Sequence, residues 1–266
     1  MATISTQSTA LITFDILELI LLQTDPQTLL TGAQQTCKTW FRTIQESHAI
    51  QKVLFFTPVN LSSPASKTKI QNPLLARKFP GFFFHDTDLV NSDCPPLLAS
   101  LDMLKRPEKL RAYIRPEASW RRMLVQQPPI FRIGILSGSF AFAECYEFHE
   151  ISANADGLRM GEFFELLLFN HDSWPLHWGT PDIIWWGNVA YQAWQRMQSL
   201  RNMTVESDLA LFGHGASSCI DYDDMISEDV TLRDRIQSVY QELNIQPNPP
   251  ADQPRMNTWE YSRWYD

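Results

Sequence analysis

The sequence predicts an α+β protein, in which an N-terminal three-helix module is followed by a mixed α+β domain without repeats. Apolar residues recur at helical spacing near the N-terminus, whereas the remainder mixes strand-like and helix-like segments between Pro- and Gly-bearing turns. No self-similarity with a period of about 20–50 residues is present, which excludes propellers and leucine-rich-repeat solenoids. With 266 residues, 44% of them hydrophobic, the chain can bury a sizeable core.

The first helix of the N-terminal module, which we place at residues 8–56, is expected over residues 14–22. Only Asp15 and Glu18 interrupt its apolar run, so apolar side chains surround most of the helix. A module of this size cannot bury both sides of such a helix by itself. The surplus face must therefore meet either the rest of the chain or another protein, and the residues alone leave both alternatives open.

Two further helices complete the module. Asp25 is a favourable N-cap and Pro26 fits the first helical position, so they predict a second helix over residues 26–33. A third helix is expected over residues 36–46. Ser47 then starts a short amphipathic segment.

The remainder divides into three parts: a polar linker at 57–71, an α+β domain at 72–246, and a Pro-rich tail at 247–266. Because the linker is polar, few contacts are expected across it. Within the domain we expect strands at 130–136 and 208–212, and helices at 116–127, 159–170, 181–200 and beyond Thr231.

Charge and cysteine usage limit the partners. The chain has a formal charge of −8, and residues 131–266 carry twenty acids against eight bases, so nucleic acid is not expected as a partner. No apolar stretch reaches the roughly 18 residues of a membrane span, and the N-terminus lacks the basic start of a signal peptide. The cysteines are Cys37, Cys94, Cys145 and Cys219. Their wide spacing is typical of reduced thiols, so we expect a cytoplasmic or nuclear protein without membrane contact.

The N-terminal module resembles a fungal F-box. The run ALITFDILELILLQTDPQTLL, followed by CKTWFRTIQESHAIQKVLFF, carries the resemblance over about 45 positions, and its Cys-x-x-Trp step is the most specific part. The resemblance implies three helices that bind a Skp-family adaptor of a cullin ubiquitin ligase. It assigns the following residues to that contact: Leu11, Phe14, Ile16, Leu17, Ile20, Leu21, Leu29, Cys37 and Trp40.

The resemblance has one departure and one weaker extension. Where the family has an apolar residue and Pro before the first helix, this chain has Thr13 and Phe14, which supply area without the fixed φ angle of Pro. Segments such as NPLL at 72–75 and GLRMGE at 157–162 are similar to those that follow the F-box in the same fungal group. That similarity implies no activity.

Candidate catalytic chemistry is limited to a few scattered groups. Metal or acid–base donors would have to come from His149, Glu150, His171, Asp172, His177 and His214. Their spacing matches no metal motif, because no His-Glu-x-x-His is present, so we expect no metal, no cofactor and no catalytic residues. If they are exposed, the best anchors for a protein target are Trp174, Trp178, Trp185 and Trp186.

The main hypothesis from the sequence is a substrate-recruiting F-box adaptor of a Skp–cullin ubiquitin ligase. Its first rival is an enzyme or small-molecule-binding protein that uses a Trp/His-lined pocket and retains a degenerate F-box. Its second rival is a ligase-independent scaffold that uses the same apolar surface. The Thr13-Phe14 departure keeps the first rival open.

Overall fold

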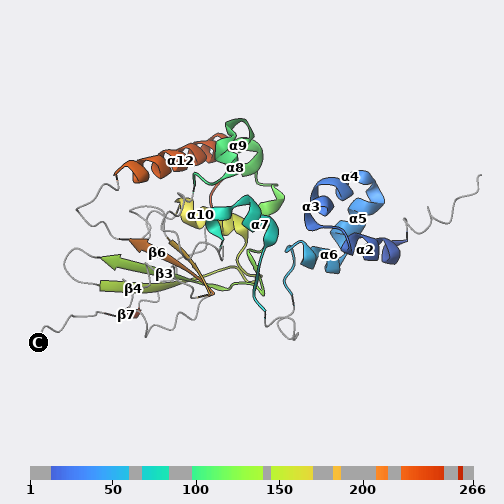
Figure 1. Cartoon of the computed structure of the whole chain (residues 1–266), viewed down its shortest axis with the longest axis horizontal. Helices are drawn as coiled ribbons and strands as arrows, with labels where there is room; N and C mark the ends of the chain where they lie inside the picture. The colour runs from blue at the N-terminus through green and yellow to red at the C-terminus, as the bar shows by residue number, and fades with distance from the viewer. Residues whose placement is uncertain are drawn as a thin grey trace, which may run out of the picture.

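In a computed structural model, the chain adopts an α+β fold, as the sequence predicts (Figure 1). The structure describes residues 13–59, 68–83, 98–139, 145–169, 182–186, 208–214, 223–248 and 257–259. No repeated unit occurs among the elements of these ranges, and none of their helices is both long and apolar enough to cross a bilayer. A helical N-terminal module adjoins a region that combines a sheet with helices.

The N-terminal module consists of short helices. They are α2 (Phe14–Leu22), α3 (Pro26–Thr28), a π-helical turn (Leu29–Ala33), α4 (Gln34–Thr36), α5 (Lys38–Glu46) and α6 (His48–Val53). The expected first helix is confirmed as α2. The expected second helix is present as α3 and the π-helical turn, which continue into α4, and the third begins at Lys38 instead of residue 36.

Two side chains fix the starts of these helices. The Asp25 carboxylate accepts a 3.0 Å hydrogen bond from the Thr28 backbone N–H, and bonding to Thr28 lowers the pKa of that carboxyl. The Ser47 hydroxyl oxygen accepts a 3.0 Å bond from the Ile50 N–H and donates to Glu18 of α2. The predicted N-cap at Asp25 is therefore confirmed. Ser47, where a new segment was expected to start, caps α6 and also ties it to α2.

A small core closes the module. Its fully or almost fully buried members are Leu17, Leu21, Leu29, Ala33, Ile44, Ile50 and Leu54, and Trp40 packs partly buried against them. Residues three or four apart on one helix share a face, which is why Leu17 and Leu21 of α2 enter the core together. Only the face of α2 that carries Leu17 and Leu21 enters this core.

The second region contains the sheet. Its elements are β1 (Ile70–Gln71), α7 (Pro73–Lys78), a 3-10 turn (Pro80–Phe82), α8 (Asp102–Lys105), α9 (Pro107–Ile114), a 3-10 turn η4 (Ser119–Arg122), β2 (Gln126–Gln127), β3 (Arg132–Ser139), β4 (Cys145–Ser152), α10 (Met160–Phe169), β5 (Asp182–Trp185), β6 (Leu209–His214), α12 (Asp223–Glu242) and β7 (Asn257–Trp259).

Five strands form the main sheet in the order β5-β6-β3-β4-β7. β3 and β6 are parallel, and the other neighbours are antiparallel. Helices α8, α9, α10 and α12 lie on one side of this sheet (Figure 1). The core between them includes Ile133 and Ile135 of β3, Phe163 and Phe164 of α10, and Ile236 of α12. A second, two-stranded sheet pairs β1 with β2.

Three expectations for the second region are confirmed and three are wrong in whole or in part. The strand expected at 130–136 is β3, which begins two residues later. The helix at 159–170 is α10 and the strand at 208–212 is β6. The helix expected over 181–200 is wrong at its start, because residues 182–185 form strand β5, whereas residues 187–200 lie outside the described ranges. Short apolar runs rich in Ile and Trp suit strands as well as helices, and here tertiary pairing decides.

The other two errors concern boundaries set by local signals. The helix expected over 116–127 is only the 3-10 turn η4, followed by β2, because the chain turns back to pair with β1. The helix expected beyond Thr231 is present, but it starts earlier than expected, because α12 begins at Asp223 and Thr231 lies inside it. The expected linker at 57–71 also ends in β1, so its last two residues belong to the small sheet.

Candidate partner-binding surface

Helix α2 is apolar on two sides. Leu17 and Leu21 are fully buried, whereas Ile16, Leu19 and Ile20 are 44%, 64% and 40% exposed. At about 100° per residue, the three exposed side chains fall within one arc of the helix, and the buried pair falls outside it. The outward face of α2 is therefore a continuous apolar stripe.

Two aromatic residues of the module are also exposed. Phe14 begins α2 and Phe41 lies on α5, the helix that packs beside it, and both side chains are at least 40% exposed. We call Ile16, Leu19 and Ile20 the α2 surface. Together with Phe14 and Phe41 they make up most of the nine large hydrophobic residues that are exposed within the described ranges. Such clustering is typical of a protein-binding surface.

A small hollow lies between the start of α2 and α5. Phe14 of α2 and four residues of α5, namely Lys38, Thr39, Arg42 and Thr43, line it. Arg42 lies 3.8 Å from Glu46 one turn along the same helix, and both side chains are largely exposed. The hollow therefore combines an aromatic wall with two cationic side chains.

The structure separates the residues expected to bind an adaptor. Phe14, Ile16, Ile20 and Cys37 are exposed, Trp40 is half-buried, and Leu11 lies outside the described residues. The assignment to the adaptor contact is wrong for Leu17, Leu21 and Leu29, because these side chains fill the core of the module and do not reach its surface. Leu19 and Phe41 were missed, although the helical spacing of Leu19 with Ile16 and Ile20 could have identified the former.

Of the four tryptophans expected to anchor a target, the two that the structure describes are not fully exposed. Trp185 is buried, stacks on Phe83, and donates its indole N–H to the Phe82 carbonyl at 3.0 Å, so it is a core residue and not an anchor. Trp186 is half-buried and donates to the Gln126 side-chain oxygen at 2.5 Å. Trp174 and Trp178 lie outside the described residues.

The candidate metal donors fall on separate strands where they are described. His149 and Glu150 belong to β4, opposite Ile135 and Gly134 of β3. His214 ends β6, and its backbone pairs with Gly138 of β3. Gly138 lies three residues after Ile135, the partner of His149. His171, Asp172 and His177 lie outside the described residues. Within the ranges that the structure describes, no three His, Cys, Asp or Glu side chains gather in a way that could hold a metal.

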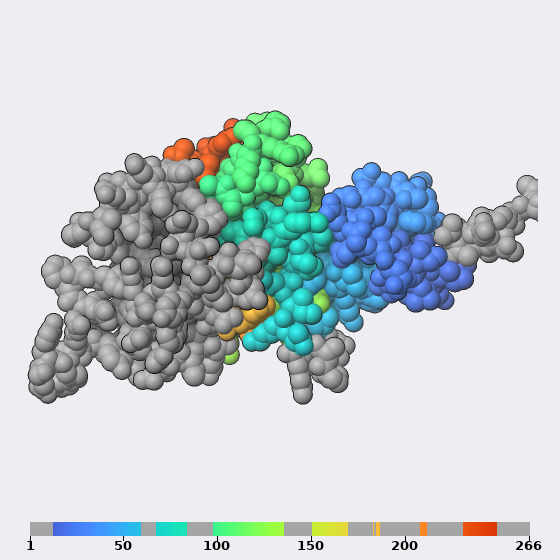
Figure 2. Space-filling model, viewed as in Figure 1, coloured from blue at the N-terminus to red at the C-terminus, as the bar shows by residue number. Residues whose placement is uncertain are grey.

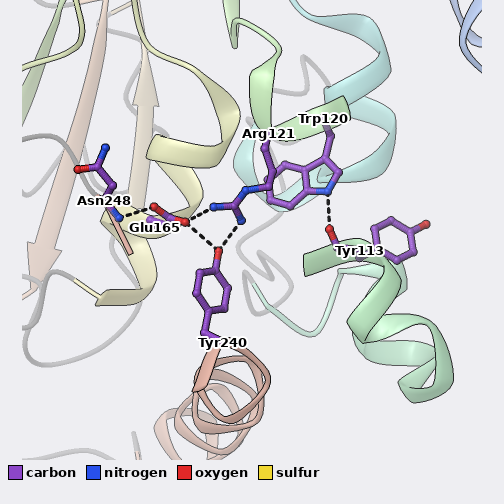
Figure 3. A network of polar contacts seen from close by, with 6 residues as sticks. All are labelled: Tyr113, Trp120, Arg121, Glu165, Tyr240 and Asn248. Carbon is purple, nitrogen blue, oxygen red and sulfur yellow. Dashed lines mark hydrogen bonds and ion pairs between the residues drawn. The ribbon is translucent and has the colours of Figure 1, made fainter. Parts of the chain in front are cut away.

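A buried polar network lies between η4, α10 and α12 (Figure 3). The Glu165 carboxylate pairs with the Arg121 guanidinium, accepts a 3.1 Å bond from the Tyr240 hydroxyl, and accepts a 2.7 Å bond from the Asn248 backbone N–H. Arg121 also donates to the Tyr240 oxygen at 2.7 Å. Burial, and next the charge of Glu165, raise the pKa of Tyr240 above its ordinary value.

This network has a structural role. Both Glu165 oxygens are occupied by donors from three different segments, and the Arg121 guanidinium also lies over the Trp120 and Tyr240 rings. A catalytic acid or base needs a proton path to a substrate, whereas these groups satisfy one another. The network therefore joins α10, α12 and the following segment.

The N-terminal module is bonded to the second region at a junction formed by residues 52–57. The Leu124 N–H donates to the Phe55 carbonyl at 2.8 Å, and Arg159 donates to the Phe56 carbonyl at 3.3 Å. The Phe56 side chain packs against both cores, and the Arg122 guanidinium lies 5.2 Å from its ring centre. The expectation of few contacts across the linker is therefore wrong (Figure 2).

The sequence and fold were compared with protein-family models, curated proteins and solved structures, and none of them matches this chain.

Proposed function

We propose that this chain is a substrate-recruiting subunit of a Skp–cullin ubiquitin ligase in the cytoplasm or nucleus. In this proposal the α2 surface binds a Skp-family adaptor, and the second region holds a protein target. The proposal joins the resemblance of residues 11–55 to an F-box with the exposed apolar stripe on α2.

The observation that carries the proposal is the second apolar face of α2. The core of the module is already complete with Leu17 and Leu21, so folding of the module gives no reason for Ile16, Leu19 and Ile20 to be apolar. Burying a side chain of this kind contributes about 1.5–3 kcal/mol. A partner that covers the stripe supplies that reason.

The junction also fits this function. A recruiting subunit works best when it presents its target at a fixed position relative to the ligase. Backbone and side-chain hydrogen bonds from Leu124 and Arg159 hold the module against the second region at Phe55 and Phe56. These contacts favour a single orientation of the two parts.

Capture of a purified Skp-family adaptor by the full chain tests the proposal. Replacing Ile16 and Ile20 by Ser removes apolar area without touching the core, so capture should weaken more than about tenfold while the thermal unfolding curve keeps its shape. The control replaces Ile70 and Phe131 by Ser, since these side chains are similarly exposed in and beside the sheets of the second region. No capture by the unchanged chain, or equal capture by the Ile16/Ile20 variant, would refute the proposal.

The target can be sought in the same system. Proteins that co-purify with the full chain should accumulate when the cullin is inhibited, because a ligase target is then bound but not degraded. A set of co-purifying proteins that is indifferent to the inhibitor would favour a scaffold role over a ligase role.

A further inference from the structure

Residues 123–127, which lead into β2 and include it, are all buried where the N-terminal module meets the second region. We call them the central segment. Their hydrogen-bonding groups are paired with several parts of the chain that lie far apart in sequence. The origin of these partners shows which parts of the structure the segment holds together.

One set of partners belongs to the second region. The Met123 carbonyl accepts a 2.8 Å hydrogen bond from the Met160 N–H at the start of α10. The Gln126 side-chain amide donates to the Asp208 carboxylate, just before β6, at 3.0 Å. The other oxygen of that carboxylate lies 2.5 Å from the Lys69 ammonium. The central segment is therefore bonded both to α10 and to the start of a strand of the main sheet.

A second set of partners belongs to the N-terminal module. The Leu124 N–H donates to the Phe55 carbonyl at 2.8 Å, and the Gln127 side-chain amide donates to the Lys52 carbonyl at 3.0 Å. Successive side chains of a strand point to opposite faces. This alternation explains why Gln126 reaches the start of β6 whereas Gln127 reaches the module.

Neither part can unfold alone and leave these contacts intact. If the module unfolded by itself, Leu124 and Gln127 would lose their acceptors, and Leu30 and Phe56 would be withdrawn from the core of the second region, against which they pack. If the second region unfolded, the carbonyls of the module's last turn would lose their donors. Lost hydrogen bonds and lost apolar burial both disfavour a partly unfolded chain.

We propose that the central segment makes the N-terminal module and the second region a single cooperative unfolding unit. In this unit, neither part stays folded when the other opens. The inference does not depend on the proposed function, but it adds a consequence to it. A partner that binds the α2 surface stabilises the second region as well, because ligand binding stabilises the whole unit that unfolds.

Hydrogen exchange of the full chain, followed by mass spectrometry, tests the proposal. The slowest backbone amides exchange only when the unit that contains them unfolds. Leu17→Ala leaves a cavity in the core of the module, so it should accelerate the slowest amides of α5 roughly thirtyfold or more. In a single cooperative unit, the slowest amides of β3, which lies inside the main sheet, should accelerate by the same factor.

Two milder variants and a control complete the experiment. Ile44→Val in the module and Ile135→Val in β3 each remove one buried methylene, so each should accelerate exchange in α5 and in β3 alike, about two- to tenfold. They also decide the matter if Leu17→Ala does not fold. The matched control is Leu19→Ala, the same change on the same helix at a side chain that is 64% exposed, and it should leave both rates within about twofold.

The pattern of acceleration decides the inference. Acceleration confined to α5 in the Leu17 or Ile44 variant would overturn it, because the module would then open by itself. Acceleration confined to β3 in the Ile135 variant would overturn it from the other side. Equal acceleration of both elements in each of these variants, with little change in the control, supports it.

A purified Skp-family adaptor gives a separate reading under the proposed function. If it binds, it should slow exchange in α5 and in β3 equally, and slowing confined to α5 would overturn the inference. If it does not bind, the proposed function alone fails, because the comparison of variants does not involve the adaptor.

Discussion

The side-chain amide of Gln127 donates a 3.0 Å hydrogen bond to the backbone carbonyl of Lys52. The same nitrogen lies 3.1 Å from the Thr57 carbonyl. These two carbonyls flank the chain reversal at Phe55, whose φ of 60° is uncommon for a bulky residue. One buried side chain of β2 thus holds both sides of the turn that ends the N-terminal module.

Replacing Gln127 by Ala should therefore destabilise the whole chain. The substitution removes the amide and leaves two carbonyl oxygens without that donor, so the free energy of unfolding should fall by about 1–3 kcal/mol in urea titrations. The control is Gln35→Ala on an exposed position of α4, which should change stability by less than about 0.5 kcal/mol. Equal stability of the two variants would mean that the junction amide contributes nothing.

The junction also marks what sequence patterns can predict. The helix start at Asp25 was predicted correctly, because a cap depends on residues within one turn. Likewise, α10 and β6 were predicted correctly from the spacing of their own apolar residues. The hydrogen bond between Gln127 and Lys52 joins residues that are far apart in the chain, so it cannot be predicted from the spacing of neighbouring residues.

The errors in the candidate surface have a related cause. Both stripes of α2 consist of Leu and Ile, so composition cannot tell which one faces the core. The packing of α5 and α6 against Leu17 and Leu21 decides it. Trp185 was misassigned for the same reason, because a Trp suits a core and an interface equally well.

The two sides of α2 should respond differently to shortening a side chain. Leu17→Ala leaves a cavity in the small core, so unfolding should require about 2–5 kcal/mol less free energy. Ile16→Ala lies one residue away on the outward stripe and should change stability by about 0.5 kcal/mol or less. Chemical denaturation of both variants measures the difference, and similar losses would contradict the assignment of the two faces.

The ion pair of Arg121 and Glu165 should matter far more to stability than a surface pair. Both partners are largely buried, so Glu165→Gln leaves the Arg121 charge without its counterion and should cost roughly 3–5 kcal/mol of unfolding free energy. Glu242→Gln breaks the pair with Arg111, which is exposed on both sides, and should cost about 1 kcal/mol or less. Urea unfolding of the two variants at neutral pH provides the comparison, and a larger loss for Glu242→Gln would contradict it.

Tyr240 should make the stability of the fold fall in alkaline solution. Its pKa is raised in the folded chain, first by burial and then by the Glu165 charge, whereas an unfolded Tyr titrates near pH 10. A group whose pKa is higher in the folded state stabilises the fold fully below its unfolded pKa, and this contribution is lost as the pH rises above that value. The unfolding free energy should therefore decline above about pH 10.

Comparison with Tyr240→Phe isolates this contribution from the lysines and other tyrosines that titrate in the same range. Near pH 8 the variant should be less stable by about 1–2 kcal/mol, because Arg121 and Glu165 each lose a hydrogen bond to the hydroxyl. Phe cannot ionise, so the difference in unfolding free energy between the unchanged chain and the variant should narrow as the pH rises above about 10. Unfolding free energies measured at intervals between pH 8 and pH 11 test this, and a gap that stays constant would mean that the buried hydroxyl does not titrate with unfolding.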